Sequence, residues 1–243
     1  MNHLLLLLIL LSSCTSNSVK IINTVDPDIV LINIEDGDRS SIAQTLLKIN
    51  SCNPKLIAID GWFIQEKDSV QDSALINALM KTKNVILGYT LDSLGQPLKS
   101  HLKFRAQFCC EGLAVLENVD GFSSHFTPKR IIDDKVHEHL ALKIVEKWKP
   151  EFISVLDKGK TIPINFTRTL DQFVHLNGSE LTIDKNLKDI NNKVVLLGYL
   201  GPSNEDKHFT SFRESMNIKN DDPDTYGVVI IANEIRTILD YNK

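Results

Sequence analysis

The sequence predicts an α/β fold, with a mostly parallel central sheet flanked by helices and an antiparallel hairpin extension on one edge. Three observations predict it. Residues 56–59 form a short, continuously apolar run rich in branched side chains, and residues 193–199 contain a similar run after Lys193, as strands buried on both faces do. Segments with the apolar spacing of a helix alternate with such runs over the first third of the chain. Asp120-Gly121, between two apolar stretches, is typical of a tight β-hairpin turn.

The first elements form a predicted βαβ unit. Residues 28–34 are the first strand, and the following helix carries Ile42, Leu46 and Ile49 at positions i, i+4 and i+7. The chain then enters residues 56–59, which we expect to be the central strand. The two strands should be parallel, because a helical crossover returns the chain in the same direction.

A second helix and a third strand continue the alternation. Asp72 or Ser73 is expected to cap the helix, and residues 85–89 read as the strand. One apolar stripe of the helix is formed by four residues: Leu75, Ile76, Leu79 and Met80.

The remainder is less regular. Residues 88–99 are expected to form a loop or hairpin, and residues 113–116 and 122–126 two antiparallel strands around Asp120-Gly121. A helix follows that Pro150 ends, then short strands over 161–166 and 173–176. Residues 201–226 show no period, and long loops of this kind in compact domains are usually functional or disordered. The closing helix carries four residues on its apolar face: Val228, Ile231, Ile235 and Leu239.

Composition limits the possible partners. The chain has 243 residues and a formal net charge of -4, which fits one large globular domain and argues against nucleic acid as the main partner. No cofactor motif is present: the Gly198-Tyr199-Leu200-Gly201 turn lacks the spacing of a phosphate-binding loop.

The amino terminus reads as an export signal. Residues 4–11 are an apolar run too short to span a membrane, and Ser12, Ser13 and Cys14 follow it. The run from Leu11 to Cys14 resembles the lipobox of bacterial lipoproteins, which predicts a signal peptide over 1–13, a lipidated Cys14 with a tether over 14–25, and one domain over 26–243. The protein would then be anchored by lipid in the cell envelope, facing the periplasm. An uncleaved anchor or a buried helix is the alternative.

Three further cysteines are present. In an oxidising compartment Cys52 could pair with Cys109 or Cys110. The favoured alternative is that all three are small buried hydrophobic residues.

Eight landmarks of the sequence occur in one order. They are D-I-V-L-I-N-I-E-D from Asp28, L-I-A-I-D-G-W-F from Leu56, D-S-A-L from Asp72, N-V-I-L-G from Asn84, V-D-G-F from Val119, K-V-V-L-L-G from Lys193, D-K-H-F-T from Asp206 and Y-G-V-V-I-I-A-N-E-I from Tyr226. This ordered set resembles the CHASE type 2 family of extracytoplasmic sensory domains. The resemblance implies a sensory or ligand-binding domain, here expected to lack an output domain of its own and to have no enzymatic activity. Ile231 stands where the family's closing motif usually has a histidine.

A ligand site is expected where the parallel strands end. The carboxyl ends of such strands meet at one edge of a sheet, and the loop over 201–226 leaves from that edge. We expect six residues to meet there: Asp36, Asp60, Asp206, His208, Thr210 and Asn233.

The chemistry of that site has alternatives. It could bind a cation, or it could be a hydrogen-bonded structural cluster, which Ile231 favours because it removes a potential ligand. The alternative functions are a periplasmic metal-dependent hydrolase, using these acids with Glu35, and a scaffolding envelope lipoprotein. The expected partners are a small ligand or an envelope protein, and the membrane through the lipid anchor.

Overall fold

A parallel sheet forms the middle layer of the molecule. The computed structural model describes residues 21–105, 110–153, 156–215, 218 and 221–241. Cys14 and the predicted signal peptide lie outside the described residues. In the described part, seven strands make the main sheet, in the order β11-β1-β12-β2-β3-β4, with β5 also paired to β3. These strands are β1 (Ile29–Asn33), β2 (Leu56–Ile59), β3 (Val85–Leu91), β4 (Pro97–Leu98), β5 (Glu111–Leu113), β11 (Val174–Asn177) and β12 (Val194–Gly198).

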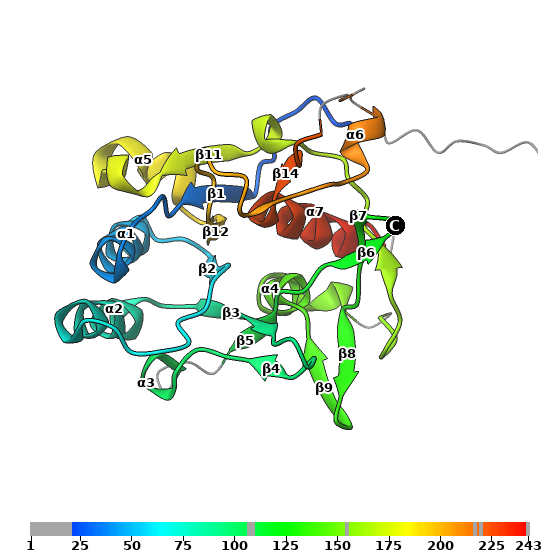
Figure 1. The fold of residues 1–243 in the computed structure, drawn as a ribbon. Helices are drawn as coiled ribbons and strands as arrows, with labels where there is room; N and C mark the ends of the chain where they lie inside the picture. Colours follow the sequence, from blue (N-terminus) through cyan, green and yellow to red (C-terminus); the bar gives the residue numbers. More distant parts are fainter. Residues whose placement is uncertain (1–20, 106–109, 154–155, 216–217, 219–220, 242–243) are drawn as a thin grey trace, which may run out of the picture.

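Helices cover both faces of this sheet (Figure 1). One face is covered by α1 (Arg39–Ser51), α2 (Ser69–Lys81), α3 (Leu102–Arg105) and α5 (Ile183–Ile190). The other is covered by α4 (Leu140–Trp148) and α7 (Gly227–Asp240). The predicted α/β class with a mostly parallel sheet is therefore confirmed.

The sheet divides the apolar interior into two cores. Leu31 of β1 and Ala58 of β2 face α4 and α7, whereas Ile32 and Ile57 face α1 and α2. Each fully buried leucine or isoleucine side chain stabilises the fold by about 1.5–3 kcal/mol. Because neighbouring residues of a strand point to opposite faces, both of their side chains are buried, which explains the continuous apolar runs.

The strand order differs from the simplest arrangement of the first βαβ unit. β1 and β2 are parallel, as predicted, but β12 lies between them and pairs with both. Val194 is aligned with Ile29 on one side and Leu56 on the other. β2 is central, as predicted, because β12 and β3 occupy its two edges.

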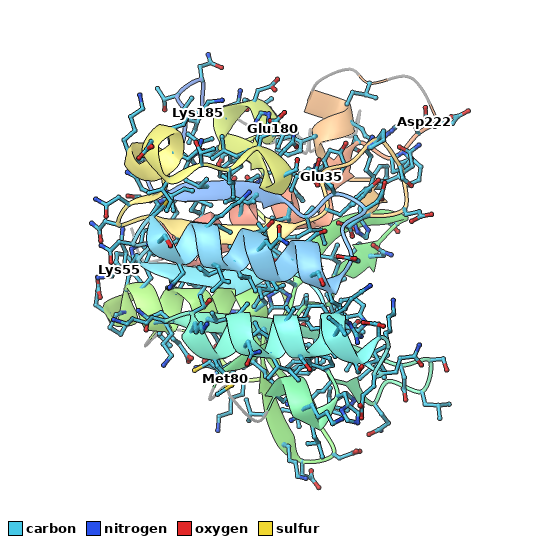
Figure 2. The ribbon with its side chains drawn as sticks, turned by 90° about the vertical axis from the view of Figure 1, so that its left-hand side faces the viewer. Glu35, Lys55, Met80, Glu180, Lys185 and Asp222 are labelled. Atoms are coloured by element: carbon cyan, nitrogen blue, oxygen red, sulfur yellow. The ribbon has the colours of Figure 1, made fainter. Side chains whose placement is uncertain are left out.

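Helix α2 begins earlier than predicted. Its N-cap is Asp68, whose side chain accepts hydrogen bonds from the N–H groups of Val70 and Gln71. Asp72, expected as the cap, is instead buried within the helix and forms an ion pair with Arg39 of α1. Figure 2 shows α1 and α2 side by side on this face. Met80, labelled there, is 58% exposed, so it does not belong to the buried stripe.

Antiparallel pairs surround the main sheet. β4 pairs with β3 as the hairpin extension of one edge. Asp120 and Gly121 have φ angles of 52° and 84°, as the tight turn predicted there requires, and join β6 (Glu117–Val119) to β7 (Phe122–Phe126). These two strands form a separate sheet with β10 (Ile162–Pro163), and the strand expected over 113–116 is absent as such, because residues 111–113 pair with β3. A further hairpin joins β8 (Lys129–Ile132) to β9 (Lys135–Glu138).

The segment after β12 is held by short elements. β13 (Lys207–His208) and β14 (Thr225–Tyr226) form an antiparallel pair, with α6 (Phe212–Ser215) between them in sequence. Two-residue strands carry no visible period, so the sequence pattern could not predict them. Short 3-10 helices occur at Pro150–Phe152, Leu170–Gln172 and Gly178–Glu180.

Cys52 is a free thiol that is 2% exposed, so the disulfide considered for it is absent. Cys109 lies outside the described residues.

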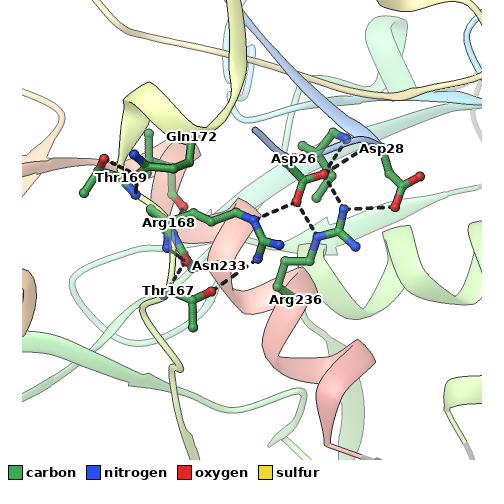
Figure 3. A network of polar contacts seen from close by, with 10 residues as sticks. Asp26, Asp28, Thr167, Arg168, Thr169, Gln172, Asn233 and Arg236 are labelled. Carbon is green, nitrogen blue, oxygen red and sulfur yellow. Dashed lines mark hydrogen bonds and ion pairs between the residues drawn. The ribbon is translucent and has the colours of Figure 1, made fainter. Parts of the chain in front are cut away.

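A polar clamp fixes the start of the domain to α7. Figure 3 shows Asp26 between Arg168 and Arg236. Arg236 donates two hydrogen bonds to the Asp26 carboxylate, of which the one from Nε measures 2.6 Å, and a third to Asp28 at 3.1 Å. The Asp26 side chain is fully buried and also accepts hydrogen bonds from the N–H groups of Asp28 and Ile29. The clamp therefore ties the entry into β1 to the last turns of α7.

Candidate functional site

A cavity of about 620 Å³ lies at the carboxyl edge of the main sheet. It is lined by residues at or just beyond the ends of four neighbouring parallel strands: Ile34, Asp60, Thr90 and Tyr199. The lining also includes residues from the loop after β12, from the segment after β5, from β6 and β7, and from α7. The topological rule that places ligand sites at this edge thus leads to a real cavity.

Asp60 is placed by the pairing of the central strands. Its N–H donates to the carbonyl of Leu197 at 2.8 Å, which extends the β2–β12 ladder by one residue and brings the side chain to the cavity. The carboxylate of Asp60 receives no hydrogen bond from the described residues. The hydrogen-bonded structural cluster therefore gains no support at Asp60.

Asp206 is placed by the small β13–β14 pair. Lys207 is aligned with Tyr226, and the N–H of Gly227 donates to the Asp206 carbonyl at 2.9 Å. A Cβ atom on Gly227 would lie only 3.1 and 3.2 Å from the two carboxylate oxygens of Asp206. Glycine at this position lets the carboxylate lie against the first turn of α7. His208, in β13, lines the same cavity.

The other three predicted site residues lie outside this lining. Asp36 is exposed in the loop before α1. Thr210 is fully buried and donates to the Asp224 carboxylate from both its N–H and its hydroxyl, at 3.0 and 2.5 Å. The structure thus brings together Asp60, Asp206 and His208, and whether they bind a ligand stays a prediction.

Asn233 holds a loop instead of facing the cavity. Its side-chain oxygen accepts from the N–H groups of Thr167 and Arg168, both at 3.1 Å, and its NH₂ group donates to the carbonyls of Arg168 and Val229. All the bonding capacity of the amide is used within the fold.

Burial raises the pKa values of the two cavity carboxyls. The pKa of Asp60 rises to about 7, through burial first and then through the negative charge of Asp206. Burial also raises the pKa of Asp206 to about 6, although the N–H of Gly227 opposes the rise. Burial lowers the pKa of His208, against the opposing effect of the Asp224 charge. The site therefore holds neutral histidine beside carboxyls that titrate close to neutral pH.

Two residues that the sequence did not place in the site belong to it: His139 lines the cavity, and Glu234 lies behind the lining. Glu234 of α7 is 0% exposed, and neither of its carboxyl oxygens has a hydrogen-bond partner among the described residues. Its Oε2 lies 3.6 Å from Nδ1 of His139, which lines the cavity. Burial, and then the charge of Asp60, raises the pKa of Glu234 well above its ordinary value. The sequence contains a signal for Glu234: it is an acid on the predicted apolar face of the closing helix, three residues after Ile231, which indicates a buried carboxyl.

His139 is an uncharged part of this wall. Burial lowers its pKa to about 4, although the hydrogen bond to the carbonyl of Val115 opposes that change. Its Nε2 donates to that carbonyl at 3.2 Å, and its Nδ1 accepts from the N–H of Ala141, which caps α4. A histidine before an apolar helix gives no specific signal in sequence, since any polar residue there could be a cap.

The arrangement of His, Cys, Asp and Glu side chains in the described residues can be compared with that of a metal site. Within the residues that the structure describes, no group of three or more His, Cys, Asp or Glu side chains is arranged to hold a metal ion. The arrangement instead offers closely spaced carboxyls beside an apolar surface, which suits a ligand that carries positive charge or donates protons.

Comparison with known proteins identifies the family. No curated protein and no solved structure matches the chain. None of the helices in the described part of the chain is long and apolar enough to cross a membrane. The family model for the CHASE2 domain matches residues 8–243. Because that match extends over nearly the whole sequence, the chain belongs to the CHASE2 family of extracytoplasmic sensory domains.

Proposed function

We propose that the protein senses a small ligand, which binds in the cavity at the carboxyl edge of the sheet, and that lipid on Cys14 holds it at the envelope membrane. The observation that carries the ligand-binding role is the cavity itself. Its volume of about 620 Å³ lies within the range of small-molecule sites, and Asp60, Asp206 and His208 converge on it.

The electrostatics of the cavity support a binding role. Carboxyls with raised pKa values destabilise a fold when they ionise, because burial and mutual repulsion both oppose their charge. Asp60, Asp206 and Glu234 share this property. Strongly perturbed pKa values cluster at functional sites, and these three groups lie at or behind one cavity. A ligand that offsets their charge would favour the bound state.

Neither alternative function gains a specific observation. A metal-dependent hydrolase would draw its ligands from the strand-end acids, but Glu35 donates no group to the cavity lining and its carboxylate accepts from the N–H of Ser179. We therefore assign no reaction to the site. An envelope protein that receives the signal remains part of the proposal.

Thermal unfolding of the purified full-length protein tests the proposed function. Metal ions and small metabolites of positive, negative and zero charge are added singly, and a ligand at a hundredfold its dissociation constant should add about 2.7 kcal/mol to the unfolding free energy. Ala114→Phe places a larger side chain in the lining and should abolish the effect. Met80→Phe, on the exposed side of α2, is the matched control.

Two results would contradict the proposal. One is the absence of stabilisation by any compound of the screen. The other is a ligand that stabilises the Ala114→Phe variant as much as the unaltered protein, which would place its site elsewhere.

A further inference from the structure

Building on the proposed function, we propose that the ligand of this cavity is a small organic molecule with a protonated primary amine, whose ammonium group lies between the carboxylates of Asp60 and Asp206. The ligand class follows from the charge of the lining, from the unsatisfied Glu234 behind it and from the apolar surface beside it.

The charged side chains of the described lining are acidic. Three acidic side chains, Asp60, Glu205 and Asp206, line the cavity, and the described lining includes no lysine or arginine. His139 and His208 have lowered pKa values, so neither adds positive charge near neutral pH. An anionic ligand would meet charge of its own sign here, whereas a cation would relieve the repulsion between the acidic side chains.

The buried carboxyl of Glu234 is a second, independent indication of a cationic ligand. Gly227, Ile231 and Glu234 lie on one face of α7 at positions i, i+4 and i+7, and the first two line the cavity. Glu234 extends this face inward to Asp60 and His139. Both oxygens of its buried carboxyl lack a hydrogen-bond partner among the described residues, an arrangement that native proteins rarely leave without a ligand, water or ion. An ammonium group beside Asp60 brings three N–H donors and one positive charge to this end of the cavity.

The remaining lining selects an organic cation over a bare metal ion. Trp62, Leu116 and Ile231 give the cavity an apolar side, and Tyr199 adds an aromatic ring. A volume of about 620 Å³ is many times that of a metal ion. An amine with an apolar or aromatic body would use both the carboxylates and this surface, including cation–π contact with the rings.

Three compounds with one skeleton test the ligand class: benzylammonium, benzyl alcohol and benzoate. Each is titrated calorimetrically into the full-length protein near pH 8, where carboxyls with pKa values of about 6 and 7 are mostly ionised. We expect benzylammonium to bind and the other two to bind at least about tenfold more weakly, since only the ammonium forms charge-assisted hydrogen bonds.

Matched variants locate the ammonium group. Asp60→Asn should weaken benzylammonium binding by about 10- to 100-fold, the usual value of a hydrogen bond to a charged group. Asp36→Asn removes one exposed carboxylate near the same edge but outside the lining, and should leave the affinity within about twofold. Circular dichroism checks the fold, and Asp206→Asn replaces Asp60→Asn if the latter does not fold.

The outcomes separate the ligand class from the proposed function. If benzyl alcohol or benzoate binds as tightly as benzylammonium, and Ala114→Phe abolishes that binding, the amine ligand class is wrong but the cavity is still the binding site. Binding of benzylammonium that neither Asp60→Asn nor Ala114→Phe alters would overturn both. A failure of benzylammonium to bind at millimolar concentration, while another compound of the wider screen binds in the cavity, would overturn the amine alone.

Discussion

Nδ1 of His139 lies 3.6 Å from Oε2 of Glu234, and the two side chains are 1% and 0% exposed. Burial lowers the pKa of His139 to about 4 and raises that of Glu234 well above its ordinary value, so both shifts favour the neutral forms. Two neutral groups avoid the cost of burying charge, which a pair of ions at this depth would have to offset by their mutual attraction. The protonation state of Glu234 is therefore part of the stability of the fold.

Glu234→Gln should stabilise the protein increasingly as pH rises. A carboxyl whose folded pKa is raised holds its proton when folded and releases it when unfolded, so its contribution to stability falls as pH rises above the unfolded value of about 4.5. Glutamine has a similar shape and no proton to lose. The gain should be small near pH 4.5 and grow by at most about 1.4 kcal/mol per pH unit.

Urea unfolding at several pH values measures this gain. Glu151→Gln, at an exposed position, is the control and should show no such trend. A Glu234→Gln effect that is the same at all pH values would mean that the buried carboxyl does not take up a proton on folding.

The ligand-free protein should also lose stability through Asp60 and Asp206. Their folded pKa values are raised from 3.8 to about 7 and about 6, so the stability that protonation provides is present in acid and is lost as pH rises from about 4 to about 7. Asp60→Asn should flatten the fall in thermal midpoint over this range. The groups that face Asp60 are Asp206 and Glu234, which are also acids and are negative when ionised, so the titrations of the three should be coupled.

Asp36→Asn serves as the comparison, and its midpoint should follow that of the unaltered protein at every pH. If Asp60→Asn also follows it, Asp60 is fully ionised in the folded protein.

Asp26→Ala should be severely destabilising. It removes the buried partner of Arg236 and the acceptor for the N–H groups of Asp28 and Ile29. Loss of one partner of a buried ion pair typically costs about 3–5 kcal/mol, because the other charge stays uncompensated. Asp28→Ala, which removes a carboxylate whose side chain is 38% exposed, should cost less than about 1 kcal/mol.

Chemical denaturation of the two variants compares these costs. Similar losses for Asp26→Ala and Asp28→Ala would show that the clamp gives little stability.

Cys14→Ala should release the protein from the membrane fraction and leave the exported domain folded. The reason is the short apolar run that ends at Leu11-Ser12-Ser13-Cys14, which fits lipid attachment at the cysteine. Fractionation after a high-salt wash is the measurement, with Ser16→Ala as the control that stays anchored. Retention of the Cys14→Ala protein on washed membranes would falsify lipid attachment at this residue.

Local sequence patterns predicted most of the helices and strands, but not which strands lie next to each other in the sheet. The apolar run at β2 and the Asp-Gly turn at 120–121 are local signals, and the structure confirms both. The insertion of β12 between β1 and β2 is set by pairing across more than 130 residues, such as Val194 with Leu56, which no local pattern encodes. The predicted start of α2 was wrong because two aspartates that could cap the helix, Asp68 and Asp72, lie four residues apart. The contact of Asp72 with Arg39 in another helix decides which of them is free to cap.

The residues of the site were also predicted where local sequence determines their position, and missed where other contacts determine it. The strand-end rule brings Asp60 to the cavity, because the direction of a strand fixes where its carboxyl end lies. Thr210 and Asn233 have equally polar side chains, but other partners occupy them. Thr210 binds Asp224 within the same loop, and Asn233 binds the backbone of Thr167 and Arg168. Glu234 shows the reverse case: it is an acid on an apolar helix face, and this local signal points to a buried carboxyl behind the cavity.

The clamp has a mechanical consequence. Arg236 follows Gly227 by nine residues in one uninterrupted helix, a distance of about 14 Å along its axis. The first turn of α7 walls the cavity, and its third turn grips Asp26, where the amino-terminal segment enters the sheet. One helix therefore connects the wall of the cavity to the point where the amino-terminal segment enters the sheet, and a displacement of α7 along its axis would move both ends together.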